Sequence, residues 1–144
     1  MASKSKVYFF FDNVKFSFQG RNRVKKSIER IFRLEKVTLQ RLNYIFCSDE
    51  KLLKINREYL KHDDYTDIIS FNFSDPGEPV TGEIYISVDR VKDNAKHMNL
   101  FFKNELSRVI IHGALHLCGY RDKTKMEKEN MRSREDFYLN RVEA

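Results

Sequence analysis

Residues 68–87 read IISFNFSDPGEPVTGEIYIS. Two segments rich in β-branched and aromatic residues, 68–73 and 82–87, flank a loop that contains both prolines of the chain. Such segments favour β-strands, and proline and glycine between them favour a turn. The stretch therefore predicts two strands that pair with each other.

The rest of the chain alternates between strand-like and helix-like patterns. Apolar residues upstream predict two more strands, at residues 7–11 and 42–46. Helical spacing predicts helices at about residues 24–35, 49–59, 88–98, 103–118 and 124–138. The order βαβαββααα indicates an α+β fold, with a small mixed four-stranded sheet, helices packed on it and a C-terminal helical layer. We expect one domain spanning residues 1–144, because the length of 144 residues suits a single core.

The composition is that of a soluble globular protein, with 41% hydrophobic and 33% charged residues. No stretch approaches the ~18 consecutive apolar residues of a transmembrane helix, and the apolar run after the N-terminus is too short for a signal peptide. Cys47 and Cys118 make no disulfide framework and suit a reducing compartment. These features predict a cytoplasmic protein without a membrane partner.

Positive charge is concentrated in the N-terminal half. Residues 1–61 carry 15 Lys and Arg against 6 Asp and Glu, whereas residues 62–101 carry 3 against 8. A basic surface of this kind suggests a polyanionic partner, and nucleic acid is the first candidate. The alternative is a solvated surface that serves solubility. The candidate RNA-binding residues lie on the outer side of the first predicted helix: Arg23, Lys26, Arg30 and Arg33.

The sequence HGALHLCGYRD at residues 112–122 has the spacing of a metal site. His112 and His116 are four residues apart on a predicted helix, so their rings project from one face, one turn apart. Gly119 suits the helix end, where the reversed chain can bring Asp122 back as a third ligand. Three protein ligands with an open fourth position are typical of a catalytic zinc site. We therefore expect one divalent metal ion, with Zn²⁺ as the best fit.

The same spacing, H-x-x-x-H-x-x-G-x-x-[HD], occurs in metzincin proteases. A zincin protease has Glu directly after the first histidine, where it acts as the general base. Here that position is Gly113, which cannot accept a proton. A metallopeptidase would need a carboxylate from elsewhere, such as Asp67 or Glu83, and is therefore the least favoured enzyme.

The stretch HGALHLCGY at residues 112–120 resembles the signature of the YbeY family, bacterial endoribonucleases and ribosomal-RNA maturation factors. INREYLKHDDYTDIISF at residues 55–71 and GEIYIS at residues 82–87 are similar to two further motifs of that family, in the same order. The resemblance implies the α+β fold and a metal-dependent endoribonuclease specific for single strands. It also implies a role in ribosomal RNA maturation and ribosome quality control, with ribosomal RNA and ribosomal proteins as partners and no nucleotide cofactor.

The chain departs from this family pattern at two functional positions. The third ligand of the family is usually His, and here Asp122 stands in its place; Asp is also a competent zinc ligand. The family arginine implicated in catalysis falls at Leu60, so Arg57 or Lys61 would have to replace it. Asp67 is a further catalytic candidate beside His112, because it could orient a ligand imidazole or polarise water on the metal. Ordinary capping of a loop is the alternative role for Asp67.

The residues and the family resemblance together leave three functions open. The first is the metal-dependent endoribonuclease. The second is a ribosome-associated factor that binds RNA or protein, holds a structural metal and has little nuclease activity, which Leu60 favours. The third is the metallopeptidase, which Gly113 disfavours.

Overall fold

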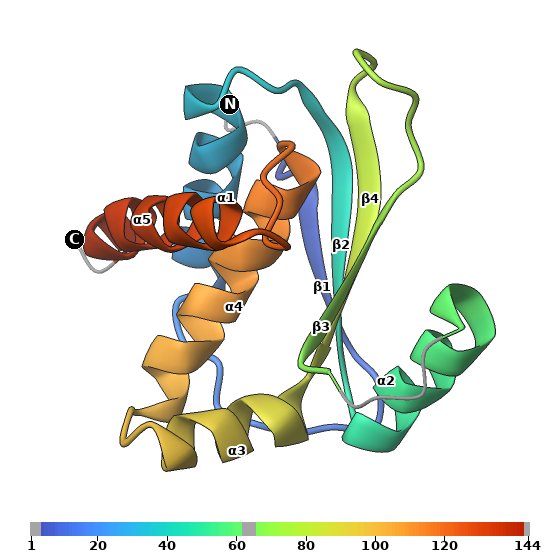
Figure 1. The fold of residues 1–144 in the computed structure, drawn as a ribbon, viewed down its shortest axis with the longest axis vertical. Helices are drawn as coiled ribbons and strands as arrows, with labels where there is room; N and C mark the ends of the chain where they lie inside the picture. Colours follow the sequence, from blue (N-terminus) through green and yellow to red (C-terminus); the bar gives the residue numbers. More distant parts are fainter. Residues whose placement is uncertain (1–3, 62–65, 143–144) are drawn as a thin grey trace.

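The computed structural model describes residues 4–61 and 66–142, which form four strands, five α-helices and one π-helix (Figure 1). In chain order the elements are β1 (Val7–Phe11), α1 (Arg21–Leu34), β2 (Leu39–Cys47), α2 (Asp49–Ile55), η1 (Asn56–Leu60), β3 (Ile68–Asn72), β4 (Val80–Ser87), α3 (Val88–His97), α4 (Phe102–Leu117) and α5 (Lys125–Val142). The π-helix η1 continues α2, so the predicted order of strands and helices is confirmed. Within the described ranges, no helix is long and apolar enough to cross a membrane.

The four strands form one mixed sheet in the order β1-β2-β4-β3. β1 pairs parallel with β2, β2 pairs parallel with β4, and β3 pairs antiparallel with β4. The predicted pair at residues 68–87 is therefore confirmed as an antiparallel hairpin at one side of the sheet. Figure 1 shows α1, α4 and α5 on one side of this sheet and α2 on the other. The predicted α+β fold with a C-terminal helical layer is confirmed.

The main core lies between the sheet and α4. Alternate residues of β2 point to this side, and Leu42, Tyr44 and Phe46 are fully buried there. The Tyr44 hydroxyl donates a hydrogen bond of 2.8 Å to the backbone carbonyl of Ile110, so the only polar atom of this side chain is satisfied inside the core. This contact helps to fix the position of α4 along β2.

Gly113 lies where α4 packs closely against the sheet. A Cβ atom at this position would lie 2.9 Å from the Cδ1 atoms of both Ile68 and Ile84. Any side chain here would displace the ends of these two isoleucines, and the glutamate that a zincin protease requires would place a carboxylate in the same apolar contact. The metallopeptidase hypothesis loses support from the fold as well as from the sequence.

The second predicted helix differs from the structure in its last turn. The sequence pattern places Tyr59 on the inner face of an α-helix, but that side chain is 67% exposed. The helix changes to π geometry at Asn56, and the wider i→i+5 turn rotates the following residues off the α-helical face. Asn56 itself is buried, and Lys61 ends the segment in the left-handed conformation, with φ of 55°.

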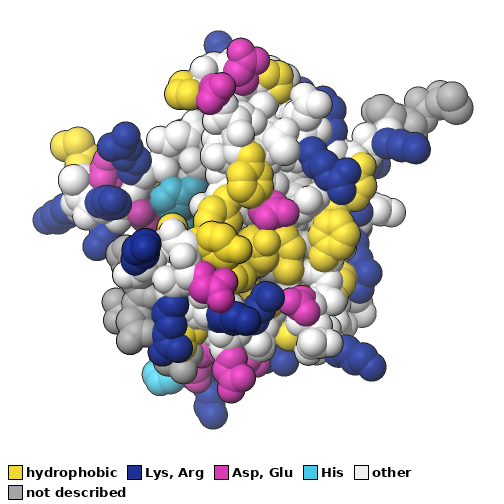
Figure 2. Space-filling view, turned by 90° about the vertical axis from the view of Figure 1, so that its right-hand side faces the viewer, with side chains coloured by type: hydrophobic (Ala, Val, Ile, Leu, Met, Phe, Trp, Pro, Cys, Tyr) yellow, Lys and Arg dark blue, Asp and Glu magenta, His cyan; other side chains and the backbone are white. Residues whose placement is uncertain are grey.

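The opposite face of the sheet is only partly covered, by α2. Figure 2 shows this side of the molecule, with hydrophobic side chains gathered at its centre and charged side chains around them. The ring of Phe71 contacts those of Tyr59, Phe73 and Tyr85, at centroid distances between 5.9 and 6.2 Å. The two histidines of the metal motif belong to α4, on the helical side of the sheet.

Candidate metal centre

His112 and His116 lie one turn apart near the C-terminal end of α4, with ring centroids 4.7 Å apart. Apolar residues between and beside them, including Ala114 and Leu115, are fully buried, so the core fixes the rotation of this helix. Both rings consequently project from the side of α4 that faces α5, and both are partly accessible. The i, i+4 spacing places the two imidazoles together, as the sequence predicted.

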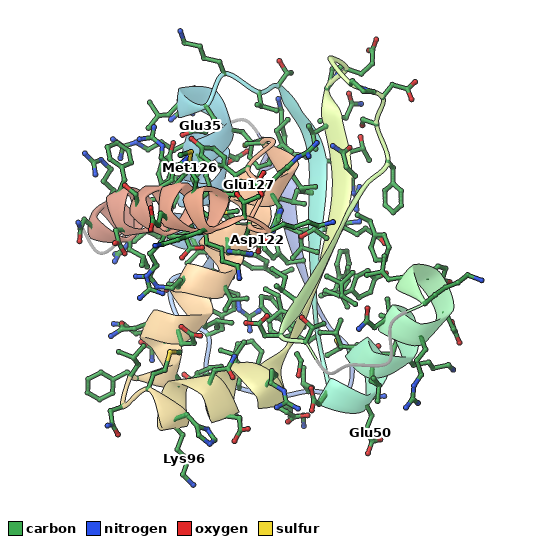
Figure 3. All side chains as sticks on the ribbon, in the orientation of Figure 1. Glu35, Glu50, Lys96, Asp122, Met126 and Glu127 are labelled. Carbon is green, nitrogen blue, oxygen red and sulfur yellow. The ribbon has the colours of Figure 1, made fainter. Side chains whose placement is uncertain are left out.

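The chain reverses directly after α4 and returns over the two rings. Gly119 has φ of 106°, a backbone conformation that side chains disfavour, and its N–H donates to the carbonyl of His116. Asp122 follows in this turn (Figure 3). Its Oδ2 atom lies 3.2 Å from Nε2 of His112 and 3.3 Å from Nε2 of His116.

These separations fit a metal ion. In a tetrahedral site with bonds of about 2.0–2.1 Å, neighbouring ligand atoms lie about 3.3 Å apart. One ligand atom from each of His112, His116 and Asp122 falls within 4.8 Å of the other two. Two imidazole nitrogens and one carboxylate oxygen form a donor set that zinc accepts, with a fourth position left for water or substrate.

Glu135 orients the first of these histidines. This side chain of α5 is only 5% exposed, and its Oε2 lies 2.6 Å from Nδ1 of His112. Because a carboxylate only accepts hydrogen bonds, Nδ1 carries the hydrogen, and Nε2 is the nitrogen that faces Asp122 and would bind a metal ion. Arg108 in turn donates to Oε1 of Glu135 at 2.8 Å and to Asp136 at 2.7 Å. The ring of His112 is therefore held by a chain of buried and half-buried charges.

The charges around His112 also affect its protonation. Burial lowers the pKa of His112, but the hydrogen bond and negative charge of Glu135, together with the charges of Asp122 and Asp67, raise it above the usual 6.5. A metal ion binds the neutral imidazole, so it would displace a proton here. The negative charges that stabilise the protonated form of His112 also stabilise a divalent cation beside this ring, because the cation has twice the charge of the proton.

A cavity of about 390 Å³ opens beside His112, between β3, α4 and α5. Asp67 and Glu105 form part of its wall, together with His112 and Asp122. Burial raises the pKa of Asp67, and the charge of His112 opposes this shift. Burial and the charge of Asp67 raise the pKa of Glu105, whose Oε1 has no hydrogen-bond partner among the described residues.

A second polar network fixes the turn that carries Asp122. Glu35, just after α1, accepts hydrogen bonds from the hydroxyl of Tyr120 at 2.7 Å and from Nε of Arg134 at 2.9 Å, and it also accepts from the hydroxyl of Tyr138. Burial raises the pKa of Glu35, but the hydrogen bonds from these three residues outweigh burial and lower it below 4.5. The turn is thereby tied to α1 and α5, two residues before the third predicted ligand.

The remaining predicted residues lie elsewhere. Arg57 and Lys61 are exposed on η1 and at its end, and neither lines the cavity beside His112. Leu60 is 43% exposed in the same segment. The four cations predicted to bind RNA are all on α1, and each is at least partly exposed: Arg23, Lys26, Arg30 and Arg33. Lys26 and Arg33 line a groove whose other walls carry three more cations, Lys4, Lys6 and Lys36.

Sequence reasoning missed Glu135 and Arg108. They lie 23 and 4 residues from His112 along the chain, and no motif joins them to the histidines. The one signal in the sequence was the position of Glu135 between Met131 and Tyr138 on the last predicted helix, since a carboxylate on a buried face needs a partner. The partner itself depends on how α5 crosses α4, which the sequence does not show.

Comparison with known proteins identifies the family of this chain. A family model described as "Endoribonuclease YbeY" matches residues 11–143. The chain belongs to the YbeY family. Membership confirms the predicted family and, with it, the prediction that the chain is an enzyme of the nuclease class.

Named members of the YbeY family match over nearly the whole chain. The endoribonuclease YbeY of Cytophaga hutchinsonii is 47% identical over 133 residues, 92% of this chain and 93% of the relative. That of Amoebophilus asiaticus is 41% identical over 136 residues, 94% of this chain and 92% of the relative. A solution structure of a Thermotoga maritima protein shares the fold with a TM-score of 0.65 and 26% identity, covering 94% of this chain and 88% of that one.

Proposed function

We propose that this YbeY-family protein is a metal-dependent endoribonuclease that cleaves single-stranded RNA in the cytoplasm, in ribosomal RNA maturation and ribosome quality control. One observation carries the metal dependence: a single oxygen of Asp122 lies 3.2 and 3.3 Å from Nε2 of two histidines, beside an open cavity. We propose Zn²⁺ as the ion, since nitrogen donors outnumber oxygen in the ligand set. Family membership supports RNA as the substrate.

The residues around the ligands have separate roles in this proposal. His112, His116 and Asp122 would hold a divalent ion, which would lower the pKa of water and offset negative charge on a phosphate. Glu135 accepts a hydrogen bond from Nδ1 of His112, which directs Nε2 toward the proposed position of the metal ion. Asp67 lies on the cavity wall as a half-buried carboxyl with a raised pKa, which suits a group that takes a proton from the attacking water.

The direct test is cleavage of a single-stranded oligoribonucleotide by metal-analysed protein, with and without a chelator. We expect about one zinc ion per chain, cleavage at internal phosphodiesters, loss of cleavage with the chelator and recovery on adding Zn²⁺. A duplex of the same sequence serves as the control and should be cut much more slowly. Cleavage that is unaffected by complete removal of the metal would contradict the proposal.

A ribosome-associated binding factor is the second candidate function. Leu60 favours it, because the segment η1 brings neither Arg57 nor Lys61 to the wall of the cavity. If metal-loaded protein cuts no more RNA than buffer while it binds ribosomal RNA or a ribosomal protein tightly, this function replaces the nuclease.

We further propose that the outer side of α1 binds the RNA backbone. The test variant changes four cations of this helix to glutamate: Arg23, Lys26, Arg30 and Arg33. RNA affinity should fall similarly for all sequences, because backbone contacts do not distinguish bases. The plot of log affinity against log salt should flatten by about 0.7 for each phosphate that the variant no longer neutralises. Fluorescence anisotropy in chelator, which keeps the strand intact, measures both effects.

Lys51 and Lys54 provide the control for this experiment. They belong to the same basic half of the chain but lie exposed on α2, across the sheet from α1. Changing both lysines to glutamate should alter the slope of log RNA affinity against log salt much less, for each charge changed, than the α1 variant does. An unchanged salt slope in the α1 variant would mean that this surface serves solubility alone.

A further inference from the structure

The cavity beside the candidate metal centre is lined on one side by α5. The α5 residues of this wall are Lys128, Met131, Arg132 and Glu135, which share one face of the helix. Four carboxylates also line the cavity: Asp67, Glu105, Asp122 and Glu135. An RNA phosphate entering this space meets strong negative charge, and therefore needs cations besides the metal ion.

Three basic side chains line the same cavity, but one is already paired. Arg108 donates to Glu135 and to Asp136 at 2.8 and 2.7 Å, so its charge is committed to the protein. Within residues 4–61 and 66–142, no carboxylate forms an ion pair with Lys128 or Arg132. Both side chains are exposed at the mouth of the cavity.

Lys128 and Arg132 also stand next to each other, at positions i and i+4 of α5. Like charges at this spacing repel each other and destabilise a helix. An anion placed between them removes that repulsion. A phosphodiester fits both partners, since a guanidinium binds two phosphate oxygens through its planar fork and an ammonium acts as a point charge.

We propose that Lys128 and Arg132 form a phosphate-binding subsite, which holds a phosphodiester of the RNA strand at the mouth of the cavity beside His112 and Asp122. The subsite rests on the proposed nuclease function for its substrate. It assigns to α5 a second role besides the support that Glu135 gives to His112. In this arrangement one face of a single helix orients a metal ligand and positions the strand.

The test compares Lys128→Gln/Arg132→Gln with the wild-type protein, both metal-loaded. We expect KM for a single-stranded oligoribonucleotide to rise about 10-fold or more, with unchanged metal content. In chelator, where the strand stays intact, the slope of log affinity against log salt should fall by about 1.4, which is about 0.7 for each of the two cations removed. Arg132→Lys with Lys128 intact keeps both charges and should keep the wild-type slope.

Lys96 is the matched control, because it is an exposed cation on α3 at the far end of the molecule from Asp122 (Figure 3). Lys96→Gln should leave KM and the salt slope unchanged. The subsite is refuted if the double variant keeps the wild-type KM and salt slope. It is also refuted if Lys96→Gln lowers the salt slope, for the one charge it removes, as much as the double variant does for each of its two. A wild-type protein that cuts no RNA refutes the nuclease function instead, and the salt slopes in chelator still decide the subsite.

Discussion

Replacing either His112 or His116 with alanine is expected to abolish stoichiometric metal binding and, with it, RNA cleavage. Each change removes one of three candidate ligands whose atoms lie within 4.8 Å of one another, and no other described group of three such residues meets that distance. Asp122→Asn keeps the shape of the third side chain but loses its charge, and should weaken binding by roughly 10- to 100-fold. Metal analysis at limiting Zn²⁺ and competition with a coloured chelator measure these differences.

His97 is the matched control for the histidine variants. It is exposed on α3, and its Nδ1 atom lies 2.8 Å from the backbone carbonyl of Asp93 in its own helix. His97→Ala should retain the metal content and cleavage rate of the wild-type protein. Equal metal content in the His112, His116 and Asp122 variants would show that the ion binds elsewhere.

Gly113→Glu is expected to destabilise the protein by about 3 kcal/mol or more. The side chain would enter the contact between α4 and the sheet, where a single Cβ already approaches Ile68 and Ile84 to 2.9 Å. Overpacking alone costs about 1–3 kcal/mol, and a buried carboxylate without a partner adds several more. Urea unfolding followed by circular dichroism measures the change in the free energy of unfolding.

Asn104→Glu places the same charge on the same helix at an exposed position and serves as the control. Its stability should remain within about 0.5 kcal/mol of the wild-type protein. The Gly113 variant completes the zincin motif in sequence, yet it should gain no peptidase activity. A stable Gly113→Glu protein that hydrolyses peptides would contradict both the packing of α4 and the argument against a protease.

Local patterns predicted most of the fold. Alternating residues such as Leu42, Tyr44 and Phe46 are buried on one side of β2, and Ser48 caps α2 by accepting a hydrogen bond from the N–H of Lys51. The order of strands within the sheet could not be predicted, because pairing between β2 and β4 joins residues about 40 positions apart. The π-helix also escaped prediction, since its residues follow the α-helical pattern in sequence.

The candidate site likewise has one part that the sequence predicts and another part that it does not. His112, His116 and Asp122 fall within eleven residues and one helix end, so their meeting follows from helix geometry. Glu135 and Arg132 reach the same place from another helix. Their position depends on the angle at which α5 crosses α4, and on the Glu35 network that ties α5 and the turn after α4 to α1. Such contacts arise from tertiary packing and leave no local motif.

The place of β4 in the sheet has a consequence for synthesis of the chain on the ribosome. β4 lies between β2 and β3, although both precede it in sequence. Until residues 80–87 have emerged, β2 has a free edge of unpaired backbone groups, and its apolar face has no α4 to cover it. Long-range pairing of this kind slows folding and exposes nascent chains to aggregation. The core between the sheet and α4 therefore cannot close until residues 102–117 have emerged, and the two candidate histidine ligands lie on that same segment.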